Sequence, residues 1–292
     1  MVPVSSYSEE TQHQVPEAQV LSTDEGGEVV QCPNCGTRVA VGRHGQEGQV
    51  MKCPYCGKEF CVREEVEKGL CYGVDAAFLS KYVARGVTTT DGWVFEPNVW
   101  ASYKGFTGSV WANMDLTNRN RNRGEFNEVD ITLDYSTSFG GLGLSGGSIY
   151  YTYPNTDAKD TAEVYAGVGY DMLLSPRLTV YYDFWQVDGF YGVFSLSHGF
   201  ELPQPAPWMK PSLALSGQVG WGSKNFNSFN FGTDHSTFTD MVYTASLPVQ
   251  VFDRFTVKPL VSYSSVLDRT LRSKNEHNDN VIWGAVFSAA LP

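Results

Sequence analysis

Apolar and polar residues alternate along most of the chain after residue 73. In residues 128–139 the apolar side chains fall on one face of an extended strand, and the acidic and hydroxyl side chains fall on the other. This period of two predicts strands with one apolar and one polar face. Twelve segments follow the pattern: 74–86, 94–103, 106–116, 128–139, 142–153, 162–172, 178–188, 190–201, 212–222, 238–250, 255–267 and 281–291.

Most of these segments are longer than the strands of globular proteins, which have about 5 to 6 residues. They match the length of about 9 to 11 residues that lets a tilted strand cross a bilayer. Short turns, such as Lys104-Gly105, alternate with longer polar loops, such as 117–127. This asymmetry is typical of outer-membrane barrels, whose short turns are periplasmic. We therefore predict an all-β fold: an antiparallel transmembrane β-barrel of about twelve strands over residues 73–292. The alternative is a soluble β-sandwich or jelly roll, whose polar face is solvated.

Composition agrees with a membrane barrel and argues against other classes. Aromatic residues make up 14% of the chain and charged residues 18%, against about 25% charged residues in soluble domains. No apolar stretch approaches the roughly 18 residues of a spanning helix, so membrane residence would require a barrel. The net charge of −11 argues against a nucleic-acid partner. Aromatic side chains near strand ends predict interfacial girdles: Tyr82, Trp93, Tyr103, Tyr135, Trp221, Tyr243, Tyr263 and Trp283.

The chain before the barrel has a different character. Residues 1–29 are acidic and contain no Lys or Arg, which predicts a disordered arm. The start MVPVSSYSEE lacks the basic start and apolar core of a signal peptide. If the barrel is exported, we therefore expect this start to be processed or trimmed.

All six cysteines fall between residues 32 and 71. Cys32, Cys35, Cys53 and Cys56 form C-x2-C, 17 further residues, and C-x2-C, a spacing that fits a zinc ribbon. Four thiolates close the coordination shell, so the predicted Zn2+ is structural. Two disulfides and a rubredoxin-like iron site are the alternatives. Cys61 and Cys71 are left over, either paired with each other or free.

The predicted ribbon spans residues 30–62, and residues 63–72 form a linker. It resembles the broad class of small CPxCG zinc ribbons, which includes nucleic-acid binders and protein-docking modules. Its few basic residues favour docking. An even number of strands puts both ends of the barrel in the periplasm, so we expect the ribbon to be periplasmic.

The first predicted strand carries a further resemblance. The segment AAFLSKYVARGV, residues 76–87, contains Ser80, Tyr82, Arg85 and Gly86 in the pattern S-x-Y-x-x-R-G. It resembles the opening strand of a family of poorly characterised, porin-like bacterial outer-membrane proteins. This resemblance implies a single outer-membrane barrel without an assigned enzymatic activity. The chain ends in WGAVFSAALP, whereas barrel-insertion signals usually end in an aromatic residue.

Parity along the strands predicts which side chains face the lumen. Acids outnumber bases among them, which favours a channel for cations or neutral polar solutes. Lys81 and Arg85 are expected to pair with acids of the fourth strand. The alternative is that the inward side chains fill a narrow barrel and leave no continuous pore. The inward set consists of Lys81, Arg85, Glu96, Trp100, Asp115, Glu128, Asp130, Asp134, Glu163, Asp171, Asp183 and Lys258. Trp111, Tyr165, Tyr181 and Trp185 also have inward parity.

Catalytic motifs are present only out of context. GLGLSGG, residues 141–147, enters a strand instead of a phosphate turn or a nucleophile elbow around Ser145. Ser195 and Ser197 have the opposite parity to His198, so they do not form a catalytic pair. We therefore predict no enzymatic activity.

Two functions remain: a small outer-membrane channel, or a non-conducting anchor whose ribbon docks a periplasmic partner. The expected surroundings are outer-membrane lipid and lipopolysaccharide, whose phosphates Arg119, Arg121 and Arg123 are placed to contact if their loop lies outside the cell. Phe226, Phe229 and Phe231 lie in a long loop. They either fold inward as a constriction or contact a partner.

Overall fold

The structure is a computed structural model of residues 1–292. It describes residues 70–121, 123–139, 141–206, 208–252 and 254–290, and only the backbone of Leu291 and of five strands before residue 64. The chain divides into two compact units, Glu10–Gly69 and a larger unit that contains Leu70–Pro292.

The smaller unit contains five strands in the order β3-β2-β1-β5-β4. β1 pairs antiparallel with β2 and parallel with β5, and it begins within the segment predicted as an acidic arm. The predicted zinc ligands Cys32, Cys35, Cys53 and Cys56 lie outside the described residues. The strands are β1 (Glu17–Asp24), β2 (Gly27–Gln31), β3 (Arg38–Val41), β4 (Val50–Lys52) and β5 (Glu59–Arg63).

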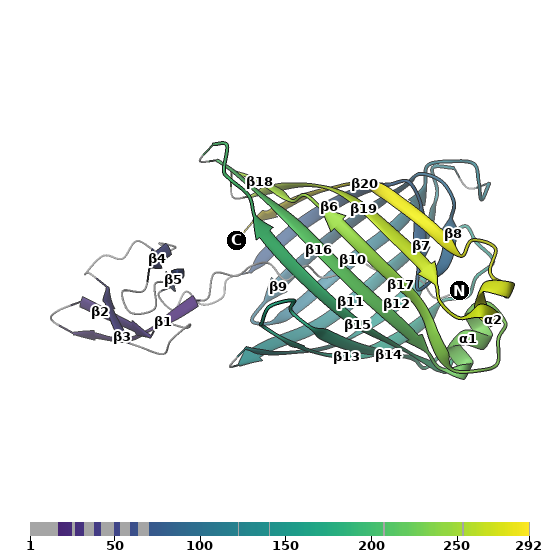
Figure 1. The fold of residues 1–292 in the computed structure, drawn as a ribbon, viewed down its shortest axis with the longest axis horizontal. Helices are drawn as coiled ribbons and strands as arrows, with labels where there is room; N and C mark the ends of the chain where they lie inside the picture. The colour runs from purple at the N-terminus through teal and green to yellow at the C-terminus, as the bar shows by residue number, and fades with distance from the viewer. Residues whose placement is uncertain are drawn as a thin grey trace. The chain divides into compact units, whose positions relative to one another are not determined.

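The larger unit is a closed antiparallel barrel (Figure 1). Neighbouring strands follow one another in sequence, β20 pairs with β6, and β15 pairs with β16. β17 and β18 form one wall strand that is interrupted at Leu247-Pro248, so the wall has twelve strands, as the sequence predicts. They are β6 (Cys71–Leu79), β9 (Val94–Tyr103), β10 (Phe106–Asp115), β11 (Phe126–Phe139), β12 (Leu142–Thr152), β13 (Thr161–Tyr170), β14 (Arg177–Asp183), β15 (Gly189–Glu201), β16 (Met209–Gly222), β17 (Thr237–Ser246) with β18 (Val249–Val251), β19 (Phe255–Val266) and β20 (Asp279–Leu291).

The connections differ between the two ends of the barrel. One end, which we call the turn end, has the short connections, such as the one between β9 and β10, and it also holds the start of β6 and the end of β20. The opposite end, the loop end, has the longer connections. Two of them contain helices that the sequence did not predict, α1 (Lys224–Phe231) and α2 (Arg269–Lys274), both visible at the loop end in Figure 1.

The first wall strand is shorter than predicted. The sequence predicts a strand over 74–86, but β6 leaves the wall after Leu79 and the chain forms a hairpin of β7 (Tyr82–Ala84) and β8 (Val87–Thr90). The turn at Arg85 and Gly86 has positive φ values of 47° and 82°. Alternation continues through the hairpin, so the sequence pattern hides the point at which the chain turns inward.

The seventh wall strand is also shorter than the predicted 178–188. β14 ends at Asp183 because its carboxylate accepts hydrogen bonds from the backbone N–H groups of Trp185, Gln186 and Val187. This local bonding turns the chain out of the ladder. Trp185, predicted to face the lumen, is consequently exposed in the loop.

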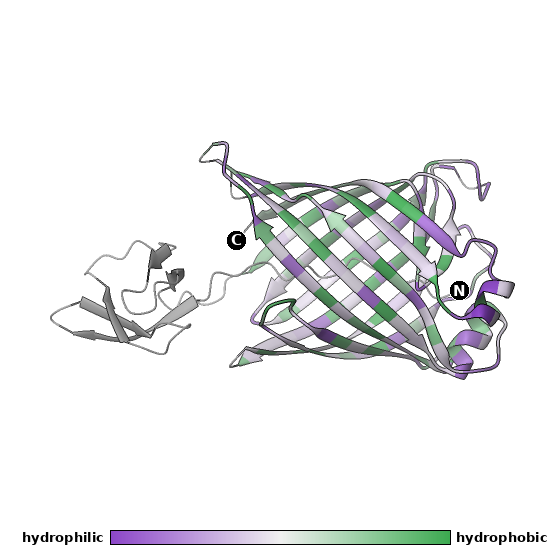
Figure 2. Ribbon diagram, in the orientation of Figure 1, coloured by the Kyte–Doolittle hydropathy of each residue, from purple (hydrophilic) through white to green (hydrophobic). Residues whose placement is uncertain are grey.

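The barrel has its apolar face outside. On β11, Ile131, Leu133 and Tyr135 are exposed, whereas Glu128 and Asp130 are buried in the interior. The same alternation gives the wall strands their striped hydropathy in Figure 2. A soluble sheet buries its apolar face, so the closed inside-out barrel is at odds with the soluble sandwich alternative. Within the described residues, no helix is long and apolar enough to span a membrane.

Seven of the eight predicted girdle residues are exposed on the outer face: Trp93, Tyr103, Tyr135, Trp221, Tyr243, Tyr263 and Trp283. The eighth, Tyr82, is buried because it belongs to the hairpin β7–β8 and not to the wall.

Candidate functional site

The hairpin β7–β8 is packed inside the barrel. Tyr82, Val83 and Ala84 are buried in one cluster with inward side chains of β6, β9, β10 and β20. The Tyr82 ring lies 5.5 Å from that of Trp111 on β10. At its base, Ser80 exchanges hydrogen bonds with the backbone of Trp283 on β20. The hairpin is therefore attached at its base to the wall and buries its apolar side chains in the lumen.

Arg85, at the tip of the hairpin, forms a bidentate ion pair with Glu163 of β13, with both N–O distances 2.7 Å. Tyr151 donates a second hydrogen bond to Glu163 at 2.9 Å. The Arg85 guanidinium lies 4.8 Å and 4.5 Å from the ring centres of Tyr181 and Tyr191. Four wall strands separate β13 from β6 along the shorter way round the barrel. The ion pair therefore connects the hairpin to the far wall.

The predicted pairing of Lys81 and Arg85 with acids of the fourth strand is wrong. Arg85 reaches β13, the sixth wall strand, because the hairpin carries it across the bore. Lys81 lies at the loop end, where it pairs with Asp91 at 2.5 Å. This contact with Lys81 lowers the pKa of the Asp91 carboxyl.

A second apolar cluster fills the lumen at the loop end. Val87 of the hairpin packs there with Phe226 and Phe231 of α1, Leu271 of α2 and inward tyrosines such as Tyr191. Of the three loop phenylalanines, Phe226 and Phe231 fold inward, while Phe229 is exposed. The hairpin and the two helices thus fill the loop end of the bore. Inward side chains near the turn end, including Trp100 and Asp134, are only half-buried.

The structure places the predicted lumen residues in three groups. Arg85, Glu96, Asp115, Glu128, Asp130, Glu163 and Asp183 are buried, and Lys81, Trp100, Asp134 and Lys258 are half-buried. Asp171 is a correction: it is exposed in the turn after β13, where its N–H donates to the Gly141 carbonyl. Strand parity does not predict the direction of its side chain, because β13 ends at Tyr170.

Buried charge in the barrel is strongly one-sided. Among the described residues, seven carboxyl side chains are buried, against one basic side chain, Arg85. Several of these carboxylates are well satisfied: Asp183 accepts from Thr161 and three backbone amides, and Asp240 accepts from Tyr191 and Thr239. The remaining excess of acid lies on β9, β10 and β11, beneath the hairpin.

Three buried tyrosines also line this interior: Tyr151, Tyr153 and Tyr191. The sequence analysis did not single them out, although their inward parity was a usable signal.

The out-of-context motifs have structural roles. Ser145 lies on β12 and accepts a hydrogen bond from Arg177 at 2.6 Å. The His198 ring packs edge-on against Phe200, 4.6 Å away. Among the described residues, no group of three or more His, Cys, Asp or Glu side chains is arranged to hold a metal ion.

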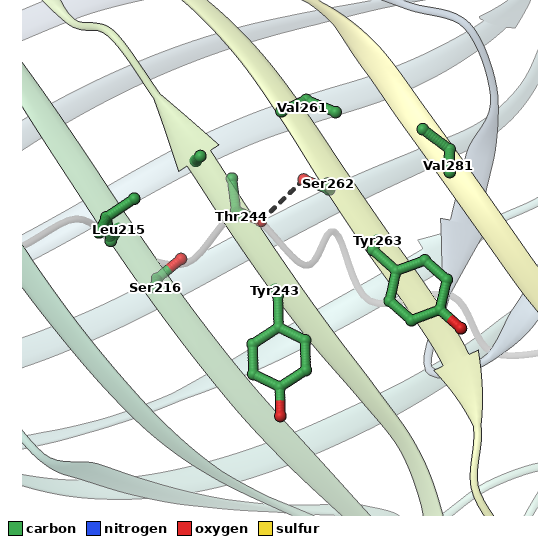
Figure 3. A pocket seen from close by; sticks show the side chains of 9 residues that line it. Leu215, Ser216, Tyr243, Thr244, Val261, Ser262, Tyr263 and Val281 are labelled. Atoms are coloured by element: carbon green, nitrogen blue, oxygen red, sulfur yellow. Dashed lines mark hydrogen bonds between the residues drawn. The ribbon is translucent and has the colours of Figure 1, made fainter.

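A groove of about 430 Å³ lies on the outer wall over β16, β17, β19 and β20. Figure 3 shows Tyr243 and Tyr263 along it, with Leu215, Val261 and Val281 around them. The hydroxyls of Thr244 and Ser262 are joined by a 2.7 Å hydrogen bond. Because the exposed Tyr243 and Tyr263 mark the outer face, the groove is separate from the lumen.

Comparison with known proteins gives a partial match at the N-terminal side. A family model described as the IBR domain, a half RING-finger domain, matches residues 13–66. No curated protein matches the chain in sequence.

Several solved membrane barrels are similar to the chain at low identity. The NanC porin is 11% identical over 75% of this chain and 100% of its own, with a TM-score of 0.48. An outer-membrane channel from Pseudomonas putida F1 is 12% identical over 76% of this chain and 96% of its own, with a TM-score of 0.42. The β domain of the Bordetella autotransporter BrkA is 12% identical over 76% and 98%, with a TM-score of 0.36. The functional argument accordingly depends on this chain's own residues.

Proposed function

We propose that the protein is an outer-membrane channel for cations or neutral polar solutes, whose bore is narrowed by the inward hairpin β7–β8. The observation that carries this proposal is the excess of buried carboxylates over the single buried base, Arg85, in the described part of the barrel. A lumen of low dielectric with one sign of charge attracts counter-ions and repels ions of like charge. Anions are therefore the solutes that this lining disfavours.

The outward apolar face supports residence in a membrane, and the turn and loop asymmetry supports the outer membrane with the turn end in the periplasm. In that orientation the loop with Arg119, Arg121 and Arg123 faces lipopolysaccharide, whose phosphates suit guanidinium groups. Arg119 and Arg121 are exposed, as this contact requires. The unit before the barrel then lies on the periplasmic side.

For that smaller unit we propose a structural zinc ribbon that docks a periplasmic protein. The match to a half RING-finger domain over residues 13–66 includes Cys32, Cys35, Cys53 and Cys56, and their spacing suits tetrahedral Zn2+. Metal analysis of the exported protein should find one zinc per chain and four thiols protected from reagent. Two disulfides among these cysteines, or bound iron, would contradict the zinc site.

A non-conducting anchor is the second candidate. It is favoured by the two apolar clusters, which fill the loop end of the bore with side chains of the hairpin, α1 and α2. In this case the barrel holds the smaller unit at the membrane and transports nothing. The lumen carboxylates are then structural groups only.

Single-channel recording in planar bilayers separates the two candidates. For the channel, we expect steps of current from the wild-type protein, and a conductance increased several-fold when residues 82–90 are replaced by a short Gly-Ser turn. Shortening the exposed loop 155–159, which lies outside both apolar clusters, is the control and should leave the conductance unchanged. If neither the wild type nor the hairpin variant conducts, the channel is excluded and the anchor is supported.

A further inference from the structure

Two neighbouring carboxylates beneath the hairpin differ from the other buried acids. Glu128 and Asp130 lie two residues apart on the inward face of β11. Glu128 is 1% exposed and Asp130 is 6% exposed. Both oxygens of Glu128, and Oδ1 of Asp130, lack a well-aligned hydrogen-bond donor. The Tyr82 hydroxyl and the Asp130 carboxyl nevertheless lie close enough to Glu128 to interact with it.

The buried acids on β13, β14 and β17 are better satisfied, whereas Asp115 on β10 also has one oxygen, Oδ2, without a donor. Glu163 has Arg85 and Tyr151 as donors, Asp183 has Thr161 and backbone amides, and Asp240 has Tyr191 and Thr239. A buried carboxylate that lacks both donors and counter-charge is strongly destabilising. In its charged form the pair therefore needs a positive partner of its own, because Arg85, whose charge reaches Asp130, is already bound to Glu163.

The surrounding polar atoms are oxygens. Asn113 pairs directly with Glu128 across the β10–β11 ladder. Its amide nitrogen donates to Asn127 at 2.6 Å, and this leaves its buried Oδ1 without a partner. The hydroxyls of Tyr82 and Tyr153 are buried, and Glu128 and Asp130 are the two charged groups that act most strongly on both of them. Wall and hairpin thus present carboxylate, amide and hydroxyl oxygens to one small region.

We propose that this region binds one Ca2+ ion, held by the carboxylates of Glu128 and Asp130 and by the neutral oxygens of Asn113, Tyr82 and Tyr153. Oxygen-only ligands select hard cations. Two carboxylates balance a divalent charge, and the buried Glu96 is a further acid near Glu128. Mg2+ keeps several of its waters in protein sites, whereas Ca2+ accepts irregular shells of protein oxygens. The buried ligands leave little space for bound water, so Ca2+ is the better fit.

The proposed ion has a structural consequence. Tyr82 belongs to the hairpin, and the other ligands belong to the wall or to the chain that follows β12. Ca2+ therefore adds a further attachment of the hairpin to the wall, besides the hydrogen bonds at its base and the Arg85–Glu163 ion pair. The binding of Ca2+ does not depend on whether the barrel conducts.

Calcium titration of the full-length, refolded and chelator-treated protein tests the proposal. We expect one Ca2+ per chain by isothermal titration calorimetry, with Mg2+ and K+ as weak competitors. Tb3+ bound in place of Ca2+ should give sensitised luminescence, because Tyr82 and Tyr153 are proposed ligands and the Tyr82 ring lies 5.5 Å from that of Trp111. Glu128→Gln and Asp130→Asn should each weaken Ca2+ binding by about tenfold or more, which corresponds to about 1.4 kcal/mol or more of binding free energy.

Asp134→Asn is the matched control, because Asp134 lies on the same inward face of β11 but accepts a hydrogen bond from Tyr165. It should retain wild-type affinity, and heat-modifiable gel mobility confirms that each variant is folded. The proposal is overturned if the wild type binds no Ca2+, or if folded Glu128→Gln and Asp130→Asn bind as tightly as wild type. Conductance is measured separately, so a barrel that conducts without binding Ca2+ rejects this site alone.

Discussion

Arg85 and Glu163 connect the tip of the hairpin β7–β8 to the far wall of the barrel. Both side chains are almost fully buried, and each has the other as its counter-ion. A buried ion pair is only weak support for stability by itself, but the loss of one partner leaves an uncompensated charge in the interior. Removal of one of these two side chains should therefore be more destabilising than removal of both.

Glu163→Gln should lower the free energy of unfolding by about 3 to 5 kcal/mol, because it leaves the Arg85 guanidinium buried without a counter-ion. Urea unfolding from lipid vesicles, followed by tryptophan fluorescence, measures the change. Arg85→Leu combined with Glu163→Leu should recover most of the loss, since neither charge remains. Wild-type stability in Glu163→Gln would mean that Arg85 is not buried in the lumen.

Gly86 is the second residue on which the hairpin depends. Its φ is +82°, and an added Cβ would lie 3.1 Å from Cβ of Asp240. Gly86→Ala should therefore cost about 1 to 2 kcal/mol of unfolding free energy. Gly108→Ala is the control, because an added Cβ there meets no atom within 4 Å. Equal stability of the two variants would argue against the tight inward turn.

Among the elements, the wall strands were readable from sequence and the elements inside the lumen were not. Alternation predicted the wall because each strand has one apolar face outside and one polar face in the lumen, with a period of two. The hairpin escaped prediction because Tyr82, Val83 and Ala84 continue the pattern of β6 while they pack inside the bore. The end of β14 escaped because the alternation of apolar and polar residues does not show that the Asp183 carboxylate accepts hydrogen bonds from the next backbone N–H groups. The partner of Arg85 depended on the hairpin and was therefore misassigned.

The helix α2 is stabilised at its start by Asp268. This carboxylate accepts hydrogen bonds from the N–H groups of Thr270 and Leu271 at 2.7 Å and 3.1 Å. Partial burial alone would raise the pKa of Asp268, but these hydrogen bonds and the neighbouring His235 lower it. The cap thus contributes stability above the unfolded carboxyl pKa of about 3.9, and that stability is lost as pH falls through the lower folded pKa.

Asp268→Ala should destabilise α2 by about 1 kcal/mol at neutral pH. Hydrogen exchange at the amides of residues 269–274 measures this loss. In the wild type, the protection of these amides from exchange should fall as acid protonates Asp268. In Asp268→Ala, the protection should already be low at neutral pH and should not change with this protonation. An acid-dependent loss of protection that persists in the variant would assign the effect to another group.

At the scale of the whole molecule, the barrel combines an apolar exterior, an acidic interior and a filled loop end. The apolar exterior follows directly from strand parity, so it was the most predictable property of the barrel. The acidic lining was also visible in the sequence, with Asp171 the exception because it lies beyond the end of β13. The filling of the loop end required contacts among α1, α2 and the hairpin that are far apart in the chain. The four cysteines before the barrel lie outside the described residues, and their zinc site stays a prediction.

The reversal potential of single channels in a KCl gradient tests the central claim most directly. An acidic lumen should make K+ more permeant than Cl−, so the current should reverse near the potassium equilibrium potential. The same measurement is repeated on the variant in which a short Gly-Ser turn replaces residues 82–90, because its currents should be larger than those of the wild type. A reversal potential near that of chloride, or no channel activity in either protein, would contradict a cation-favouring bore.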